Sequence, residues 1–227
     1  DALPEELLDR TVALYYASPA NPQGAVASRA VWRAVVEKAR AHDFMLFADE
    51  CYSEIYRGDA APEGVLAATL DLGAGLSRVV AFNSLSKRSN LPGLRCGFAA
   101  GDPDFLRRWV GFRNMAAPQV PGPVQAVAVA ALADEAHVIE NRRLYDAKYA
   151  AAERLLAGRY GYATPPGGFF LWLDVAALGG GEAVALRLWR EAGVRTVPGG
   201  YLCGSGADGH NPGAAYLRVA MVESPAL

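Results

Sequence analysis

The sequence predicts an α/β protein in which helices flank a mostly parallel sheet. Apolar runs of strand length alternate with longer stretches of helical period, and a turn or polar residues follow each run. The composition changes in the last third of the chain, which indicates a second, smaller unit. Four nearly continuous apolar runs, typical of strands covered on both faces, are the expected strands: residues 11–16, 44–48, 78–82 and 94–99.

Helices are expected between these strands. Residues 28–42 carry Val31, Val35 and Ala39 on one stripe and begin at a serine suited to an N-cap. This pattern predicts a crossover helix between the first two strands. Residues 103–112 are predicted to form another helix.

A long alanine-rich stretch is expected to link two domains. Residues 123–156 contain no proline after the first residue, and their pattern predicts one long helix or a kinked pair broken near Asp134. We therefore expect the C-terminal part of a large domain over residues 1–122, a linking helical region over 123–156, and a small α+β domain over 157–227.

Composition favours a small-molecule partner. The chain has 22 basic and 24 acidic residues without a block of like charge, which argues against a nucleic-acid partner and a polybasic membrane patch. No apolar run reaches membrane-spanning length, and the first residues lack the order of a signal peptide. The three cysteines are far apart and lack CxxC pairing, so we expect free thiols and a cytoplasmic protein.

The segment SLSKRSNLPGLRCG, residues 84–97, carries the most chemistry. A lysine forms an imine only when its amine is neutral, and Lys87 lies between two predicted strands, where a pocket could lower its pKa. Ser84, Ser86 and Arg95 are suited to bind a phosphate. If Lys87 stood alone, a solvated loop lysine would be the better interpretation.

A second motif, FMLFADECY, places polar residues at the end of a strand. Asp49 would lie at the carboxyl edge of the sheet, where open α/β folds bind ligands. A buried aspartate there could keep a pyridine nitrogen protonated, and Tyr52 could bond the ring's phenolic oxygen. Taken alone, Asp49 would more simply cap a helix.

Two further motifs add an amide and a guanidinium. Asn21, between two prolines in YYASPANPQG, could donate a hydrogen bond to the same ring, although such a dipeptide is usually only a turn. Arg218 interrupts the apolar strand YLRVAMV, where a substrate carboxylate would be a good bidentate partner. The alternative for Arg218 is an edge-strand arginine that faces water.

The ordered set SPANPQG, ADECYSEI, SLSKRSNLPGLRCG, PGGFFLWLD, VPGGYLCG and YLRVAMV resembles the class I/II aminotransferases of pyridoxal-5′-phosphate (PLP) fold type I. The resemblance implies a PLP-transferase fold and a PLP cofactor. It also implies the following roles: Lys87 forms the imine with PLP and carries the proton, Asp49 pairs with the pyridinium nitrogen, Asn21 and Tyr52 bond the ring oxygen, Ser84, Ser86 and Arg95 bind the phosphate, and Arg218, with Asn21 nearby, binds the substrate.

Three longer stretches resemble the succinyldiaminopimelate aminotransferases of bacterial lysine biosynthesis: SLSKRSNLPGLRCGF, DEAHVIENRRLYDAKY and VPGGYLCGSGADGHNPGAAYLRVAMV. That resemblance implies glutamate as amino donor, N-succinyl-2-amino-6-ketopimelate as acceptor, and a homodimer. Arg88 and Arg113 are candidates for the distal carboxylates on charge alone. The family's upstream phosphate turn, its ring-stacking aromatic residue and its final helix are not in this sequence, so we expect part of a longer enzyme.

Alternatives remain open. The scaffold also supports an aspartate- or aromatic-type aminotransferase, a β-lyase or a decarboxylase, because a lysine–PLP linkage does not decide which bond at Cα breaks. A PLP-sensing regulator would carry an upstream helix-turn-helix, and the residues given contain none. His137 and Asn141 lie four residues apart without a third ligand, so no metal site is predicted. The tryptophans at positions 109, 172 and 189 are expected in the core or an interface.

Overall fold

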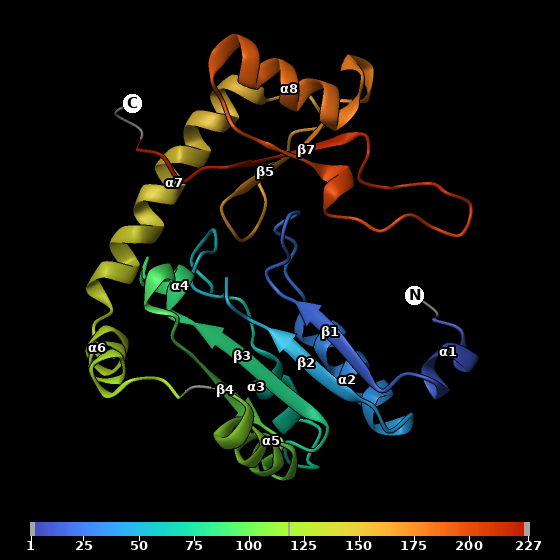
Figure 1. Ribbon diagram of the computed structural model, residues 1–227, viewed down its shortest axis with the longest axis vertical. Coiled ribbons are helices and arrows are strands. Elements are labelled where there is room, and N and C mark those ends of the chain that lie inside the picture. The colour runs from blue at the N-terminus through green and yellow to red at the C-terminus, as the bar shows by residue number, and fades with distance from the viewer. Residues whose placement is uncertain (1–2, 118, 225–227) are drawn as a thin grey trace.

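The computed structural model describes residues 3–117 and 119–224, and it contains two sheets joined by a long helix (Figure 1). The first sheet has the order β1-β2-β3-β4; its first three strands are parallel and β4 is antiparallel. The second has the order β5-β7-β6 and is antiparallel. The strands are β1 (Ala13–Ala17), β2 (Met45–Asp49), β3 (Val79–Ser84), β4 (Gly97–Gly101), β5 (Phe170–Asp174), β6 (Val197–Pro198) and β7 (Tyr216–Ala220).

Helices cover and connect these sheets. The α-helices are α1 (Glu5–Asp9), α2 (Arg29–Ala41), α3 (Val65–Leu70), α4 (Leu85–Arg88), α5 (Pro103–Ala116), α6 (Gly122–Ala133), α7 (Ala136–Leu156) and α8 (Gly180–Ala192). Short 3-10 turns lie at η1 (Pro92–Leu94), η2 (Ala176–Leu178) and η3 (Gly199–Tyr201). The predicted α/β class with a mostly parallel sheet is confirmed. The fourth strand begins later than expected, because η1 and the left-handed Arg95 (φ 53°) precede it.

The crossover helix α2 packs on one face of the first sheet. Ser28 caps it as predicted, since its Oγ accepts a hydrogen bond from the Val31 amide at 3.3 Å. The predicted stripe is confirmed at Ala39, which is fully buried, and Val35 packs partly buried against the same core. Trp32 and Val36 are also fully buried and Val31 is exposed, so the buried face is rotated toward Trp32. The indole explains the rotation, because the largest side chain of the helix enters the core while its Nε1 donates to the Glu63 carbonyl at 3.0 Å.

The helix α5 begins at a well-satisfied carboxylate. Asp102 Oδ1 accepts from the amides of Asp104 and Phe105, both at 2.9 Å, and Oδ2 accepts from the Arg78 amide at 2.8 Å. Burial raises the pKa of Asp102, but these three donors outweigh it, so the net pKa lies below the ordinary value. The cap therefore joins the start of α5 to the start of β3.

Replacing Asp102 by alanine should lower the free energy of unfolding by about 2 kcal/mol, because it removes an N-cap and leaves a buried amide unsatisfied. In the unchanged protein this stabilisation is fully present above the ordinary aspartate pKa of 3.8 and is lost as pH falls through the lower folded-state pKa. Thermal unfolding measured across that pH range tests both statements. Asp104→Ala is the control, since its side chain is 75% exposed; equal losses for the two variants would contradict the prediction.

The link between the sheets is a broken helix, as predicted. α6 ends at Ala133 and α7 begins at Ala136, so the break lies at Asp134. On the second sheet, Leu171, Leu173 and Leu217 pack against α7 and α8. The opposite face of that sheet is directed at the first sheet (Figure 1).

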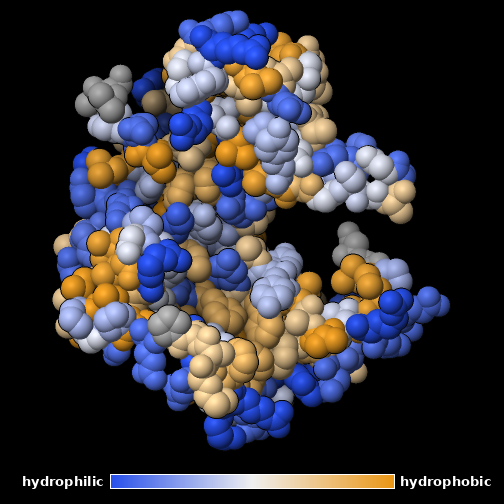
Figure 2. All heavy atoms as spheres, in the orientation of Figure 1, coloured by the Kyte–Doolittle hydropathy of each residue, from blue (hydrophilic) through white to orange (hydrophobic). Residues whose placement is uncertain are grey.

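Part of the surface is hydrophobic. Figure 2 shows hydrophobic side chains gathered over the front of the first sheet and over α6. Tyr15, on the face of β1 opposite α2, is 76% exposed. The three cysteines are free thiols, as expected. Within residues 3–117 and 119–224, no helix has the length and hydropathy to cross a membrane.

Candidate active site

The carboxyl ends of β1, β2 and β3 bring the sequence-predicted residues to one edge of the first sheet. Ala17, Asp49 and Phe82 lie side by side in the strand register. Asn21 follows β1, Asp49 ends β2, and Lys87 follows β3 on the single turn α4. Because parallel strands end at the same edge, motifs far apart in sequence converge there.

Lys87 lies against two aromatic rings. Its Nζ is 5.1 Å from the centroid of the Phe169 ring and 5.8 Å from that of Tyr52. Phe169 in turn stacks on Tyr145, with centroids 5.5 Å apart and planes 12° from parallel. Within the described residues, no carboxylate forms an ion pair with Lys87. The amine therefore has a mainly aromatic surrounding.

Sequence reasoning named Tyr52 but missed Phe169 and Tyr145 as site residues. In the sequence, PGGFFLWLD is one of the family motifs, and Tyr145 belongs to the long helical stretch 123–156. Nothing in local periodicity indicates that Phe169 meets Lys87 or that Tyr145 stacks on Phe169, because Phe169 directly precedes β5 and Tyr145 lies on α7. The resemblance motif was the only available signal for Phe169.

Tyr52 and Cys51 keep their protons near neutral pH. Burial raises the pKa of Tyr52, and the positive charge of Arg218 partly opposes that rise. Burial raises the pKa of the Cys51 thiol to about 12, assisted by its hydrogen bond with Asp49 and by the charge of that carboxylate. The Tyr52 hydroxyl can therefore donate a hydrogen bond, whereas the Cys51 thiol is inert.

Asp49, at the end of β2, and Glu50, which follows it, have different surroundings. The expectation that Asp49 is buried is wrong. Asp49 is exposed, and its Oδ1 accepts from the Cys51 amide at 3.0 Å. Glu50 is the buried carboxylate: it accepts from the Val65 amide at 2.6 Å, and burial raises its pKa. Successive residues leave a strand on opposite faces, so Asp49 points to the open face while Glu50 supports α3. No helix begins at Asp49, so the capping alternative is also wrong.

The predicted phosphate ligands are only partly assembled. Ser84 Oγ donates to Ser86 Oγ at 2.9 Å and accepts from the Ser86 amide at 3.1 Å, which places two hydroxyls at the start of α4. Arg95 is exposed, and its Nη1 donates to the Pro92 carbonyl at 2.8 Å. The segments are adjacent, since the Leu85 amide donates to the Cys96 carbonyl at 3.1 Å, but no described hydrogen bond joins Arg95 to either serine.

Arg218 on β7 of the second sheet meets Asn21, which follows β1 of the first sheet. Arg218 Nη1 donates to Asn21 Oδ1 at 3.0 Å, and the guanidinium lies 4.6 Å from the centroid of the Phe170 ring. Because Oδ1 accepts from Arg218, the amide nitrogen of Asn21 remains available as a donor. Arg218 Nε is buried and has no hydrogen-bond partner among the described residues, which is costly for a purely structural arginine.

The two arginines considered for distal carboxylates have other contacts. Arg88 is 11% exposed; it pairs with Glu135 and donates to the Ala131 carbonyl. Arg113 lies 5.5 Å from the Trp109 ring and lines a cavity of ≈ 680 Å³ together with Arg95. That cavity is larger than the one beside Glu50 and Ser84, which has ≈ 320 Å³, but Lys87 lines neither of them. The position of the Lys87 amine, and not the size of a cavity, therefore marks the reactive centre. Of the tryptophans, Trp189 is exposed on α8, contrary to a core position.

The assembled donors fit PLP. The Lys87 amine suits the aldehyde of PLP, and the Asp49 carboxylate at the sheet edge suits its ring nitrogen. The Tyr52 phenol, which retains its proton, and the available amide of Asn21 suit its ring oxygen. Two hydroxyls with a nearby exposed guanidinium suit a phosphate. When bound, PLP would supply an aldehyde that reacts with the Lys87 amine and an electron-poor ring.

Known proteins resemble this chain in sequence and in fold. The chain is 36% identical over 204 residues to the 4-dedimethylamino-4-oxo-anhydrotetracycline transaminase OxyQ of Streptomyces rimosus, covering 89% of this chain and 54% of the relative. It matches an aminotransferase structure from Neisseria meningitidis with a TM-score of 0.90 and 38% identity, covering 99% of this chain and 56% of the other. It also matches the "probable N-succinyldiaminopimelate aminotransferase" from Thermus thermophilus with a TM-score of 0.84 and 29% identity, covering 97% and 57%.

The chain thus spans about half the length of the curated relatives it matches. The family model for aminotransferase class I and II matches residues 1–223, and the cofactor of that family is PLP. By sequence, by fold and by the convergence of its motifs at one sheet edge, this chain belongs to the class I and II aminotransferases.

Proposed function

We propose that the protein is a PLP-dependent transaminase that moves an amino group between an amino acid and a 2-oxo acid. The observation that carries this proposal is the joint placement of a lysine amine beside aromatic rings and of a guanidinium–amide pair at the same sheet edge. The first suits a group that both binds PLP and moves a proton; the second suits an α-carboxylate.

In this proposal each side chain has one task. Lys87 would hold PLP through its amine and, as a free amine, would move a proton at the substrate Cα. Asp49 would accept a hydrogen bond from the ring nitrogen, and Tyr52 would donate one to the ring oxygen. Ser84, Ser86 and Arg95 would hold the phosphate. Arg218 orients the substrate carboxylate beside Asn21.

For the substrate, we propose N-succinyl-2-amino-6-ketopimelate with glutamate as amino donor, as in lysine biosynthesis through diaminopimelate. The motifs KRSN and HNPG and the name of the Thermus relative support this choice. OxyQ is named as the transaminase of a 4-oxo-anhydrotetracycline, so family membership by itself leaves the acceptor open. We also propose a homodimer, which rests on the resemblance, and a cytoplasmic location, which the free thiols of the three cysteines support.

Glutamate separates the possible reactions in the full-length protein loaded with PLP. We expect stoichiometric 2-oxoglutarate and a pyridoxamine spectrum from a single half-reaction. Pyruvate and ammonia from a cysteine conjugate would instead indicate a β-lyase, carbon dioxide a decarboxylase, and binding without turnover a regulator. The pyridoxamine form can then be mixed with candidate oxo acids; faster reaction with a non-succinylated acceptor than with the succinylated one would overturn the substrate proposal.

A further inference from the structure

One stripe of the linking helix α7 contacts the turn that carries Lys87. His137, Asn141, Tyr145 and Tyr149 are spaced four residues apart, so they lie on one face of α7. The two polar members meet the residues after Lys87, and the two aromatic members meet the strand region that carries Phe169. The helix α7 therefore contacts the residues that follow Lys87 and, through Phe169, the ring beside its amine.

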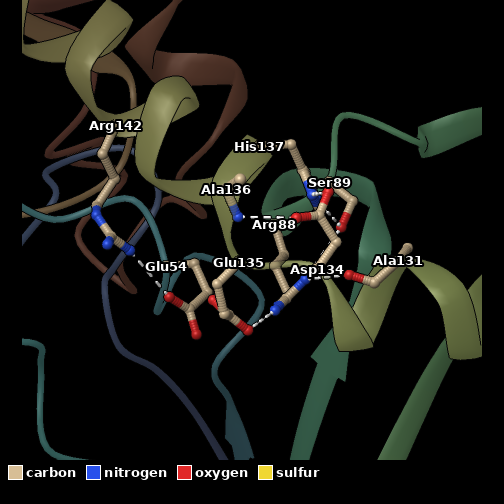
Figure 3. A network of polar contacts seen from close by, with 9 residues as sticks. All are labelled: Glu54, Arg88, Ser89, Ala131, Asp134, Glu135, Ala136, His137 and Arg142. Atoms are coloured by element: carbon tan, nitrogen blue, oxygen red, sulfur yellow. Dashed lines mark hydrogen bonds and ion pairs between the residues drawn. The ribbon is translucent and has the colours of Figure 1, made fainter.

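The polar half of the stripe holds the end of α4. His137 Nε2 is 2.9 Å from Ser89 Oγ, and Nδ1 is 2.9 Å from Asp134 Oδ2, as Figure 3 shows. An ionised carboxylate only accepts, so Nδ1 carries a proton; in a neutral ring Nε2 then accepts from the Ser89 hydroxyl. One turn further along, Asn90 Nδ2 donates to the buried Asn141 Oδ1 at 2.9 Å.

Arg88 provides an anchor for the same turn. This residue follows Lys87 directly; its Nη1 donates to the Ala131 carbonyl at 2.8 Å and its Nη2 pairs with Glu135 (Figure 3). The segment after Asp49 is also tied to α7, because Arg142 Nη1 lies 3.2 Å from Glu54 Oε2. Three consecutive residues after Lys87 thus bond to the α6–α7 region.

The aromatic half of the stripe fixes the opposite side. Tyr145 stacks on Phe169, the ring whose centroid is 5.1 Å from Lys87 Nζ. The Tyr149 hydroxyl donates to the Phe170 carbonyl at 3.0 Å. A shift of α7 would therefore move both the base of the lysine and the ring beside its amine.

We infer that His137 is a positioning residue for the proposed transamination, acting through its hydrogen bond with Ser89 to hold the turn on which Lys87 stands. This inference rests on the proposed function, because it assigns a task to the support of a lysine that transfers protons. A displacement of Lys87 of about 1 Å is enough to slow a proton transfer whose rate depends on near-contact geometry.

The competing role for His137 is capping of α7 alone. Asp134 Oδ1 accepts from the Ala136 amide at 2.9 Å, and the hydrogen bond from His137 is the main reason that the pKa of Asp134 lies below its ordinary value. A histidine needed only for this cap would act through Nδ1. One needed for Lys87 would act through Nε2.

Two substitutions, each of which puts an amide group near the place of one ring nitrogen, separate these roles in the full-length, PLP-loaded protein. His137→Gln places an acceptor where Nε2 lies and keeps the Ser89 contact, whereas His137→Asn places a donor where Nδ1 lies and keeps the Asp134 contact. We expect His137→Ala and His137→Asn to lower kcat about tenfold with little change in KM, and His137→Gln to restore kcat. Hydroxylamine should also release PLP about tenfold faster from the first two variants than from His137→Gln, a readout independent of turnover.

The control is His42→Ala, because His42 also pairs with an aspartate, Asp9 at 2.7 Å, on another part of the surface. It should leave kcat and PLP release unchanged. Rescue by asparagine instead of glutamine, wild-type behaviour of His137→Ala, or rescue by neither would overturn the inference. Borohydride trapping followed by peptide mapping keeps the two hypotheses apart: PLP found elsewhere than on Lys87 contradicts the proposed function, not the role of His137.

Discussion

Lys87→Ala should abolish covalent capture of PLP and lower turnover by about a thousandfold or more, because the amine both holds the cofactor and moves the proton. After borohydride reduction of the unchanged full-length protein, the pyridoxyl group should map to the peptide that contains residue 87. The variant should show no such adduct, and its visible absorbance should correspond to PLP bound without a covalent link.

The chain offers two matched controls, since its sequence contains only three lysines. Lys38 is exposed on α2. Lys148 is the sharper comparison, because burial lowers its pKa and its Nζ donates to the Met221 carbonyl at 2.9 Å. Alanine at either position should leave the adduct on Lys87. An adduct that moves to Lys148, or that persists in Lys87→Ala at a reducible site of this chain, would show that the central assignment is wrong.

Arg218→Lys should lower kcat/KM for amino acids and oxo acids about a hundredfold while PLP remains bound. Lysine keeps the charge but lacks the planar fork that can bind a carboxylate and Asn21 at once. The loss should come largely through KM, because the interaction is present in the bound substrate as well as in the transition state. Single half-reactions with glutamate measure it directly.

A substrate without the α-carboxylate completes the test. With the corresponding primary amine, the unchanged protein and Arg218→Lys should react at similar low rates, since the group that Arg218 recognises is gone. Arg195→Lys is the matched control, because Arg195 lies over the Trp189 ring and is exposed. An equal loss with amine and amino acid would mean that Arg218 supports the fold rather than the carboxylate.

The sequence predicted the parts of this protein that depend on local pattern. The α/β class, the crossover helix with Ser28 at its start and the break near Asp134 follow from periodicity and capping, which neighbouring residues determine. The order of the motifs indicated the family and named Lys87, Asp49, Tyr52 and Arg218. The buried face of α2 includes Ala39 as predicted, but Trp32 is buried in place of Val31, because that choice depends on the shape of the core.

Only the tertiary structure decided which side chains meet. It placed Asp49 on the open face and buried Glu50, since the two faces of β2 have different coverings that alternation alone does not reveal. It held Arg88 at the junction of α6 and α7 through Glu135 and Ala131. It also brought Phe169 to the Lys87 amine and His137 to Ser89 from distant parts of the sequence. The sequence determined the reactive groups, because their chemistry belongs to single residues. Their support came from long-range packing, which no local pattern records.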